Sequence, residues 1–131
     1  MKTIHRAAFA TLLAASALGA SPAYATGDIY CEGDGASVDM LVGRLQVISI
    51  LRTVVTVGEE VWSSDQSYAP GTPIRVGQAF EDDRFMAVDF MDDNLEQIIG
   101  RLRVVNLADH SAGVFAMEGK GSWIMDCSLR G

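Results

Sequence analysis

The sequence predicts a mainly β fold, an antiparallel β-sandwich or a small barrel of seven to eight strands with one short helix. Short segments rich in Val, Ile, Phe and Met recur between turn-forming residues, which is the pattern of an antiparallel meander. One cysteine stands near each end of the region after residue 25, so we expect the first and last strands to be neighbours. No repeat or linker divides this region, which predicts a single domain over residues 26–131.

The first 25 residues have the three-part layout of a secretory signal peptide. Basic residues precede a small and apolar run from Ala7 to Ala20, and Ala23 and Ala25 are small residues that signal peptidase accepts. We therefore expect cleavage after Ala25 and a mature protein that is periplasmic or secreted. The apolar run is shorter than the ~20 residues that span a bilayer, and no later stretch replaces it, so we expect no membrane span.

In the first half of the mature chain, strands are expected where apolar or β-branched residues run between glycine turns. Gly33-Asp34-Gly35 and Gly58-Glu59-Glu60 supply two of these turns, and the second is a short hairpin connection. The apolar stretch 45–57 is too long for one ordinary strand, so we expect a bend or a bulge near Ser49. The strands expected here cover residues 28–32, 37–42, 45–57 and 61–62, and residues 63–73 form the longest loop.

A second hairpin, residues 74–90, is expected around the polar turn 81–84. The helix follows it, because Asp93 precedes Glu96 by three residues as in a capping box, and apolar residues then recur at helical spacing. We expect this helix over residues 94–100. The remaining strands are expected at 102–107, 114–117 and 123–129, with a turn at 119–121.

Cys31 and Cys127 are the only cysteines, and the expected compartment is oxidising, so we interpret them as one disulfide. In the chain-entropy treatment, closing a loop of this length stabilises the fold by up to ~4.7 kcal/mol. Redox or metal chemistry is the alternative, but there is no Cys-x-x-Cys motif, and His110 is the only histidine after the signal. We therefore predict no metal site and no cofactor.

The mature chain is acidic, with 8 basic residues against 17 acidic ones, a net charge of about −9. Such a surface repels phosphate backbones and anionic membranes, so nucleic acid is not an expected partner. A protein or another component of the cell envelope is the expected partner.

No set of residues matches the pattern of a known catalytic site, so we predict no catalytic residue and no enzyme activity. A Ser-His-Asp relay would have to use Asp109-His110-Ser111, and three adjacent residues in a turn do not present the required geometry. The Gly-x-Ser-x-Gly motif is absent as well. Paired carboxylates leave a carbohydrate-active hydrolase as an alternative.

Acidic residues gather in two predicted turns, at 81–83 and 89–94. Two such loops together offer the oxygen ligands of a calcium site, but the EF-hand order of ligands is absent, and Asp93 is already the expected helix cap. We therefore expect turn and capping roles, with calcium binding as the alternative.

Aromatic residues divide between expected core and expected surface. Trp62 and Trp123 occupy strand positions, where burial is expected. The long loop carries polar residues and one tyrosine, an aromatic type that is common in interface hot spots. The predicted partner-contact residues are Ser64, Asp65, Gln66 and Tyr68.

Three motifs resemble those of small exported bacterial β proteins of unknown function: Gly77-Gln78-Ala79-Phe80, Val88-Asp89-Phe90 leading into Asp92 to Glu96, and the ending from Gly119 to Cys127. This resemblance implies no activity. The chain is more distantly similar to C-type lysozyme inhibitors, small acidic β-barrels with a cysteine near each end and a Tyr-x-Cys start. Here Tyr30 directly precedes Cys31, and the Ser-Gly-x-x-Tyr inhibitory segment of that family has no match.

Together these observations predict a non-catalytic periplasmic protein that binds another macromolecule. The first alternative is an inhibitor of a cationic cell-wall-degrading enzyme, because a strongly acidic charge speeds encounter with a basic target. The second alternative is the hydrolase that uses paired carboxylates.

Overall fold

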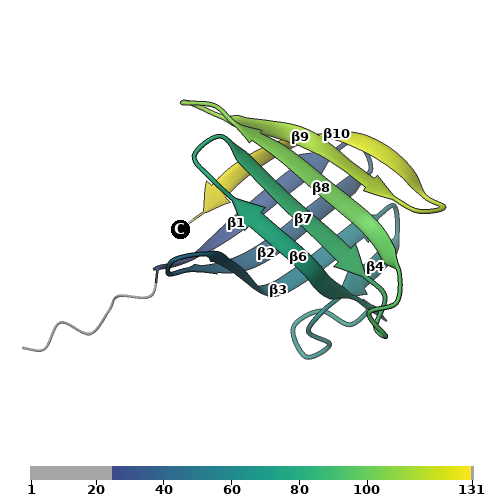
Figure 1. The fold of residues 1–131 in the computed structure, drawn as a ribbon. Coiled ribbons are helices and arrows are strands. Elements are labelled where there is room, and N and C mark those ends of the chain that lie inside the picture. Colours follow the sequence, from purple (N-terminus) through teal and green to yellow (C-terminus); the bar gives the residue numbers. More distant parts are fainter. Residues whose placement is uncertain (1–24, 131) are drawn as a thin grey trace, which may run out of the picture.

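The computed structural model describes residues 25–130, and the expected signal peptide before Ala25 lies outside the described residues. Figure 1 shows strands throughout this region, and within it the chain forms ten of them. Their bounds are β1 Ala25–Gly33, β2 Ala36–Arg44, β3 Ile48–Val57, β4 Glu60–Ser63, β5 Thr72–Pro73, β6 Arg75–Glu81, β7 Phe85–Met91, β8 Ile98–Asn106, β9 Ser111–Met117 and β10 Gly121–Arg130.

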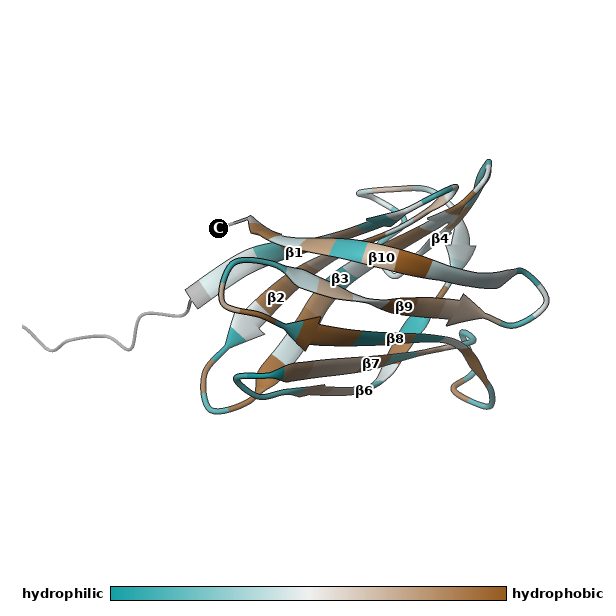
Figure 2. Ribbon diagram, turned by 90° about the horizontal axis from the view of Figure 1, so that it is seen from above, coloured by the Kyte–Doolittle hydropathy of each residue, from teal (hydrophilic) through white to brown (hydrophobic). Residues whose placement is uncertain are grey.

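The ten strands form one sheet that curls into a nearly closed barrel (Figures 1 and 2). Neighbouring strands pair antiparallel, except that the short β4 and β5 run parallel. The sheet order begins at β5 and ends at β6, and β1 pairs with β10 in its middle. Of the two architectures that the sequence left open, the structure therefore has the barrel.

One gap in the barrel wall is defined here as the seam. It lies between β6 and the first half of β3, residues 48–52, which is paired with β2 on one side but not with β4 on the other. Within the described chain no backbone ladder joins β3 to β6, so each presents an unpaired edge to the seam.

The barrel interior is filled by the inward side of each strand. In β2 and β7 every second residue is buried, which is the period that a strand with one buried face requires. Phe115 sits among aromatic rings, edge-on to Phe90 with centroids 6.1 Å apart and stacked on Trp123 at 5.9 Å. Trp62 is buried and Trp123 packs against the core, so the expected core positions of both are confirmed.

The disulfide between Cys31 and Cys127 is confirmed. The two cysteines face each other in the β1–β10 ladder, with Cα atoms 4.0 Å apart, and both side chains are buried. The first and last strands are therefore tied together inside the barrel. Such a bond is consistent with an oxidising, extracytoplasmic compartment.

The predicted helix over residues 94–100 is wrong. Residues 92–97 form a turn, and β8 begins at Ile98. The carboxylate of Asp92, not that of Asp93, accepts hydrogen bonds from the backbone N–H groups of Glu96 and Gln97. These bonds close a tight turn between two antiparallel strands in place of a helix N-terminus.

Two further expectations need correction. The strand count is ten rather than seven to eight, and β5, a two-residue strand within the predicted loop 63–73, is too short to show a hydrophobic pattern. The stretch 45–57 becomes a strand only at Ile48, whereas the bend or bulge expected near Ser49 is confirmed, because the register between β2 and β3 shifts at Leu51. Nowhere in residues 25–130 is there a helix that could cross a lipid bilayer.

Candidate functional site

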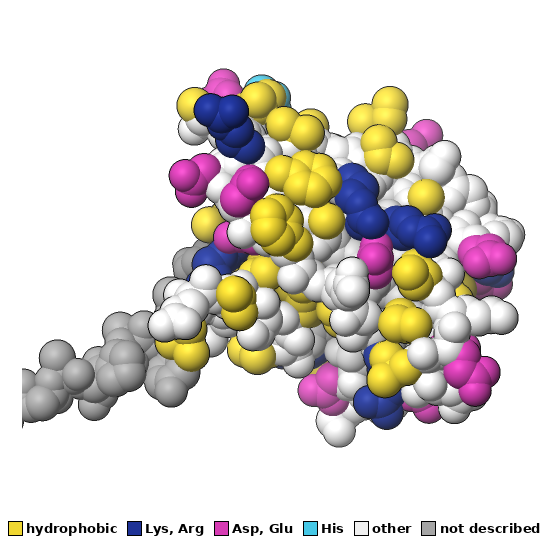
Figure 3. Space-filling view, viewed as in Figure 1, with side chains coloured by type: hydrophobic (Ala, Val, Ile, Leu, Met, Phe, Trp, Pro, Cys, Tyr) yellow, Lys and Arg dark blue, Asp and Glu magenta, His cyan; other side chains and the backbone are white. Residues whose placement is uncertain are grey.

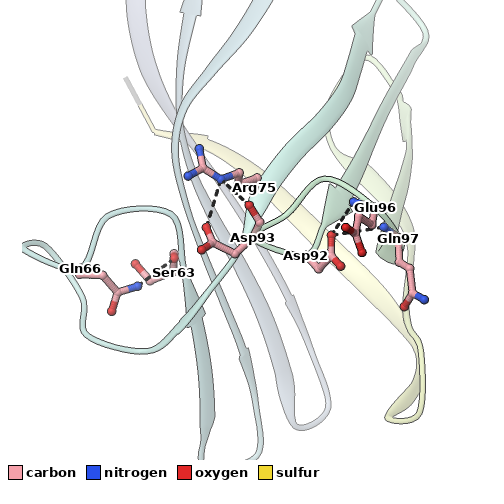
Figure 4. Close-up of polar contacts among 7 residues, drawn as sticks. All are labelled: Ser63, Gln66, Arg75, Asp92, Asp93, Glu96 and Gln97. Atoms are coloured by element: carbon pink, nitrogen blue, oxygen red, sulfur yellow. Dashed lines mark hydrogen bonds and ion pairs between the residues drawn. The ribbon is translucent and has the colours of Figure 1, made fainter.

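A groove of about 550 Å³ opens at the end of the seam where β6 begins, and it is called the seam groove below. Four segments line it: the first half of β3, the end of β4 with the loop after it, the start of β6 with the residues just before it, and the turn before β8. Figure 4 shows the polar side chains of the loop and of the turn around Arg75. The lining residues are Ile50, Leu51, Ser63, Ser64, Gln66, Pro73, Ile74, Arg75, Val76, Asp93 and Leu95.

The loop between β4 and β5 is held in shape by its own side chains. The hydroxyl of the buried Ser63 donates to the backbone oxygen of Asp65, and the amide of Gln66 donates to the backbone oxygen of Ser63 at 3.1 Å. The side-chain oxygen of Gln66 then accepts from the N–H of Gly71 at 3.0 Å. The carboxylate of Asp65 accepts from the N–H groups of the next two loop positions, 67 and 68. The loop is therefore a preformed surface.

Two contacts fasten this loop to β3. Ser64 exchanges hydrogen bonds with the backbone of Thr53, at 2.9 and 3.0 Å. The guanidinium of Arg52 lies 3.5 Å from the ring centroid of Tyr68, close enough for a cation–π interaction. Of the four predicted partner-contact residues, Ser64 and Gln66 line the seam groove, whereas Asp65 and Tyr68 organise the loop behind it.

Leu95 is the most unusual residue at the rim of the seam groove. Its backbone φ is +59°, in the left-handed region, and the other described residues with positive φ are glycines. That conformation costs a residue with a β-carbon roughly 1–2 kcal/mol. Its side chain is 53% exposed, so the turn holds an apolar side chain out toward solvent instead of packing it in the core.

Arg75 joins the turn to the start of β6. Its Nε donates to both the backbone oxygen and the carboxylate of Asp93, at 3.0 and 3.1 Å (Figure 4). Both side chains are more than half exposed, so this ion pair positions the turn more than it stabilises the fold. The turn that presents Leu95 is thus fixed at two points, by Asp92 inside it and by Arg75 beside it.

The comparisons with known proteins add nothing to this geometry. No protein-family model, curated protein or solved structure matches the chain. The site is therefore interpreted from its own residues, and the resemblances stated from the sequence stay predictions.

His110, the only histidine among the described residues, does not activate the serine next to it. His110 Nδ1 lies 2.8 Å from the carboxylate of Asp109, and both side chains are exposed. The hydroxyl of Ser111 donates instead to the side-chain oxygen of Asn106, at 3.0 Å. The hydrogen bond from His110 holds the pKa of the Asp109 carboxyl below its usual value. The arrangement is a surface pair, not a nucleophile relay.

Most carboxylates of the two acidic turns have protein partners. Glu81 binds Arg44 and Asp89 binds Arg103, each at 2.8 Å. Asp82 accepts from the N–H groups of residues 84 and 85, and Asp92 and Asp93 hold the turn described above. Among the described residues no group of three potential ligands is placed to hold a metal ion.

Sequence reasoning missed Leu95 and Arg75 as site residues. Leu95 was expected among the apolar residues at helical spacing in the predicted helix 94–100, whereas a lone leucine among acidic residues was the available signal. Arg75 gave no signal, because its partner Asp93 is 18 residues away and the pairing depends on how β6 and the turn meet.

Proposed function

We propose that this chain is a non-catalytic binding protein of the periplasm or the medium, and that it binds a partner protein in the seam groove. The observation that carries the proposal is the left-handed, exposed Leu95 at the groove rim. Backbone strain persists where the surrounding structure enforces it, and such positions cluster at functional sites. The hydrogen bonds of Asp92 and Arg75 enforce it here.

Burial of Leu95 by a partner offsets the free-energy cost of that backbone strain. Removing a leucine side chain from water is worth about 1.5–3 kcal/mol, and this leucine gains little of that in the free protein. Leu51, which also lines the groove, is 55% exposed as well. Two exposed leucines from separate segments, among the polar lining residues of one groove, fit a protein segment that inserts an apolar side chain.

The seam adds a second means of holding such a segment. Edge strands with unpaired N–H and C=O groups pair readily with an extended chain from another protein. The edges of β3 and β6 are of this kind, and the seam groove lies where they meet the loop and the turn. We therefore expect an extended peptide segment, bound partly through its backbone.

In two cavities the lining carboxylates support a non-catalytic role, whereas the two carboxylates of a third hollow, Glu32 and Asp126, lie side by side on β1 and β10. A glycosidase needs two carboxylates on opposite sides of one cleft. Asp93 is the one carboxylate that lines the seam groove, and it is paired with Arg75. A smaller cavity at the other end of the barrel also has one carboxylate in its lining, Glu81, and that is paired with Arg44.

Site-specific photo-crosslinking in the living cell tests this proposal. A photoreactive amino acid is placed at position 95, and in a matched chain at the exposed position 124 on the outer face of β10. We expect a discrete crosslinked species from position 95 that is absent from position 124. Crosslinking that is equal at both positions, or present only at position 124, would contradict the proposal.

Inhibition of a cationic cell-wall-degrading enzyme is the second candidate. It is favoured by Glu32 and Asp126, two exposed acidic residues that lie directly opposite each other on β1 and β10. Like charges in this position repel, and a basic partner would relieve the repulsion. Unchanged muramidase activity in the presence of excess purified protein would remove this candidate.

A further inference from the structure

The end of the barrel away from the seam groove contains a cavity of about 350 Å³, called the mouth cavity below. It lies where β2, β6, β8 and β10 end and β7 and β9 begin. Its floor is apolar and buried, and it is formed by Ile29, Met86 and Val104. This volume is at the lower end of the ~300–1,000 Å³ range of small-molecule sites, which often lie in the mouths of β-barrels.

The polar groups of the mouth cavity carry no net charge. Arg44 and Glu81 line it together and neutralise each other through two hydrogen bonds, at 2.8 and 3.0 Å. Asn106 accepts from the Ser111 hydroxyl, which leaves the amide nitrogen of Asn106 as a donor at the cavity. An uncharged hydrogen-bonding group matches this set, whereas an anion would also meet the strongly acidic charge of the whole chain.

Exposed apolar side chains surround the mouth cavity. Leu129 lines it and is 66% exposed. Leu45 and Leu107 directly follow the lining residues Arg44 and Asn106, and both are more than half exposed. In Figure 3 hydrophobic side chains gather on the visible face toward the end where the C-terminus lies in Figure 1. Single exposed apolar residues are ordinary, but a set from three separate segments around one cavity marks a ligand site.

We propose that the mouth cavity binds a small uncharged amphiphile, with the apolar body of the ligand on the floor and its polar end toward Asn106. The floor contacts the apolar body of the ligand, and the rim side chains cover the part of that body that the cavity leaves exposed. The ion pair is neutral overall, so it gives no charge for a charged head group to pair with. This site is independent of the seam groove, because the two have no lining residue in common.

A pair of fluorescent probes tests both the site and its charge preference. N-phenyl-naphthylamine is neutral and brightens in apolar surroundings, and anilinonaphthalene sulfonate carries the same ring system with a negative charge. We expect saturable binding of the neutral probe to the mature, oxidised protein, and binding of the sulfonate at least tenfold weaker. Absence of saturable binding of the neutral probe, or equal affinity for the two probes, would overturn the proposal.

Two substitutions on β10 locate the bound probe. Leu129→Asp places a charge at the cavity rim, and Ile124→Asp places the same charge on the outer face of the same strand, where Ile124 is 83% exposed. Both sites are exposed, so both variants are expected to fold, and cooperative urea unfolding verifies this. L129D is expected to weaken probe binding at least fivefold and I124D less than twofold. Equal weakening by both variants would overturn the proposal.

Discussion

The guanidinium of Arg44 and the carboxylate of Glu81 join the ends of two strands that are not neighbours in the sheet through two parallel hydrogen bonds, Nε to Oε1 at 2.8 Å and Nη2 to Oε2 at 3.0 Å. Arg44 ends β2, and Glu81 ends β6. The two side chains are 30% and 23% exposed, so solvent screens this pair less than it screens an ordinary surface pair. The side chain of Glu81 also raises the pKa of Arg44, which stays protonated.

Glu81→Gln is expected to lower the free energy of unfolding by about 1–2 kcal/mol, because the half-buried Arg44 loses its charged acceptor. Urea denaturation monitored by tryptophan fluorescence measures this change. Asp93→Asn is the matched control, since its ion pair with Arg75 is more than half exposed and should be worth less than about 0.5 kcal/mol. Equal losses from both substitutions would show that the Arg44–Glu81 pair contributes no more to stability than the exposed Arg75–Asp93 pair.

Replacing both cysteines by alanine is expected to remove roughly 3–5 kcal/mol of stability, since the bond closes a loop that spans almost the whole domain. Urea denaturation of the oxidised wild type and of the Cys31→Ala/Cys127→Ala variant provides the comparison. Mass spectrometry of protein taken from the cell adds an independent check. Free thiols at both positions would contradict the disulfide and the oxidising compartment that it implies.

Leu95→Gly is expected to stabilise the free protein by about 0.5–1 kcal/mol. Glycine adopts a positive φ without strain, and little buried apolar surface is lost because the leucine is already exposed. Leu107→Gly is the control, because Leu107 is equally exposed but is not among the residues with positive φ. This control should destabilise the protein slightly. A loss of stability in Leu95→Gly would mean that the turn is not strained.

The Asp109–His110 pair predicts a small pH effect with a definite sign. Because His110 lowers the pKa of the Asp109 carboxyl in the folded state, the stabilisation is present above the ordinary value of 3.8. It is lost as the pH falls through the lowered pKa. Carboxyl NMR titration should give Asp109 a midpoint below 3.8 in the wild type and a higher midpoint in His110→Ala than in the wild type. A midpoint that His110→Ala leaves unchanged would contradict this cause.

The sequence predicted those parts of the fold that depend on local alternation and on the cysteines. The alternation in β2, the glycine turn at Gly35 and the terminal disulfide all follow from short-range pattern or compartment. The closure of the barrel could not be predicted in this way. Arg44 and Glu81 are 37 residues apart, and nothing in either segment indicates that the end of β2 meets the end of β6.

The helix prediction was wrong because the segment fits both the helical period and the two-residue period of a strand. Leu95, Ile98 and Ile99 have helical spacing, but Ile98 also begins the alternating strand that runs to Asn106. Gly100, interpreted as a helix end, instead lies where a β-carbon would come within 3.4 Å of both Phe90 and Phe115. A glycine here lets two core rings pack against the backbone of β8. The strand therefore gains core packing that an exposed helix would lose.

The affinity of the partner captured at position 95 tests the central claim most directly. Leu95→Asp puts a charge where the partner is proposed to bury an apolar side chain, and Ile124→Asp makes the same change at an exposed site outside the seam groove. Calorimetric titration with the purified partner should show binding at least tenfold weaker for L95D and less than twofold weaker for I124D. Unchanged affinity of L95D, or greater loss in I124D, would contradict binding in the seam groove.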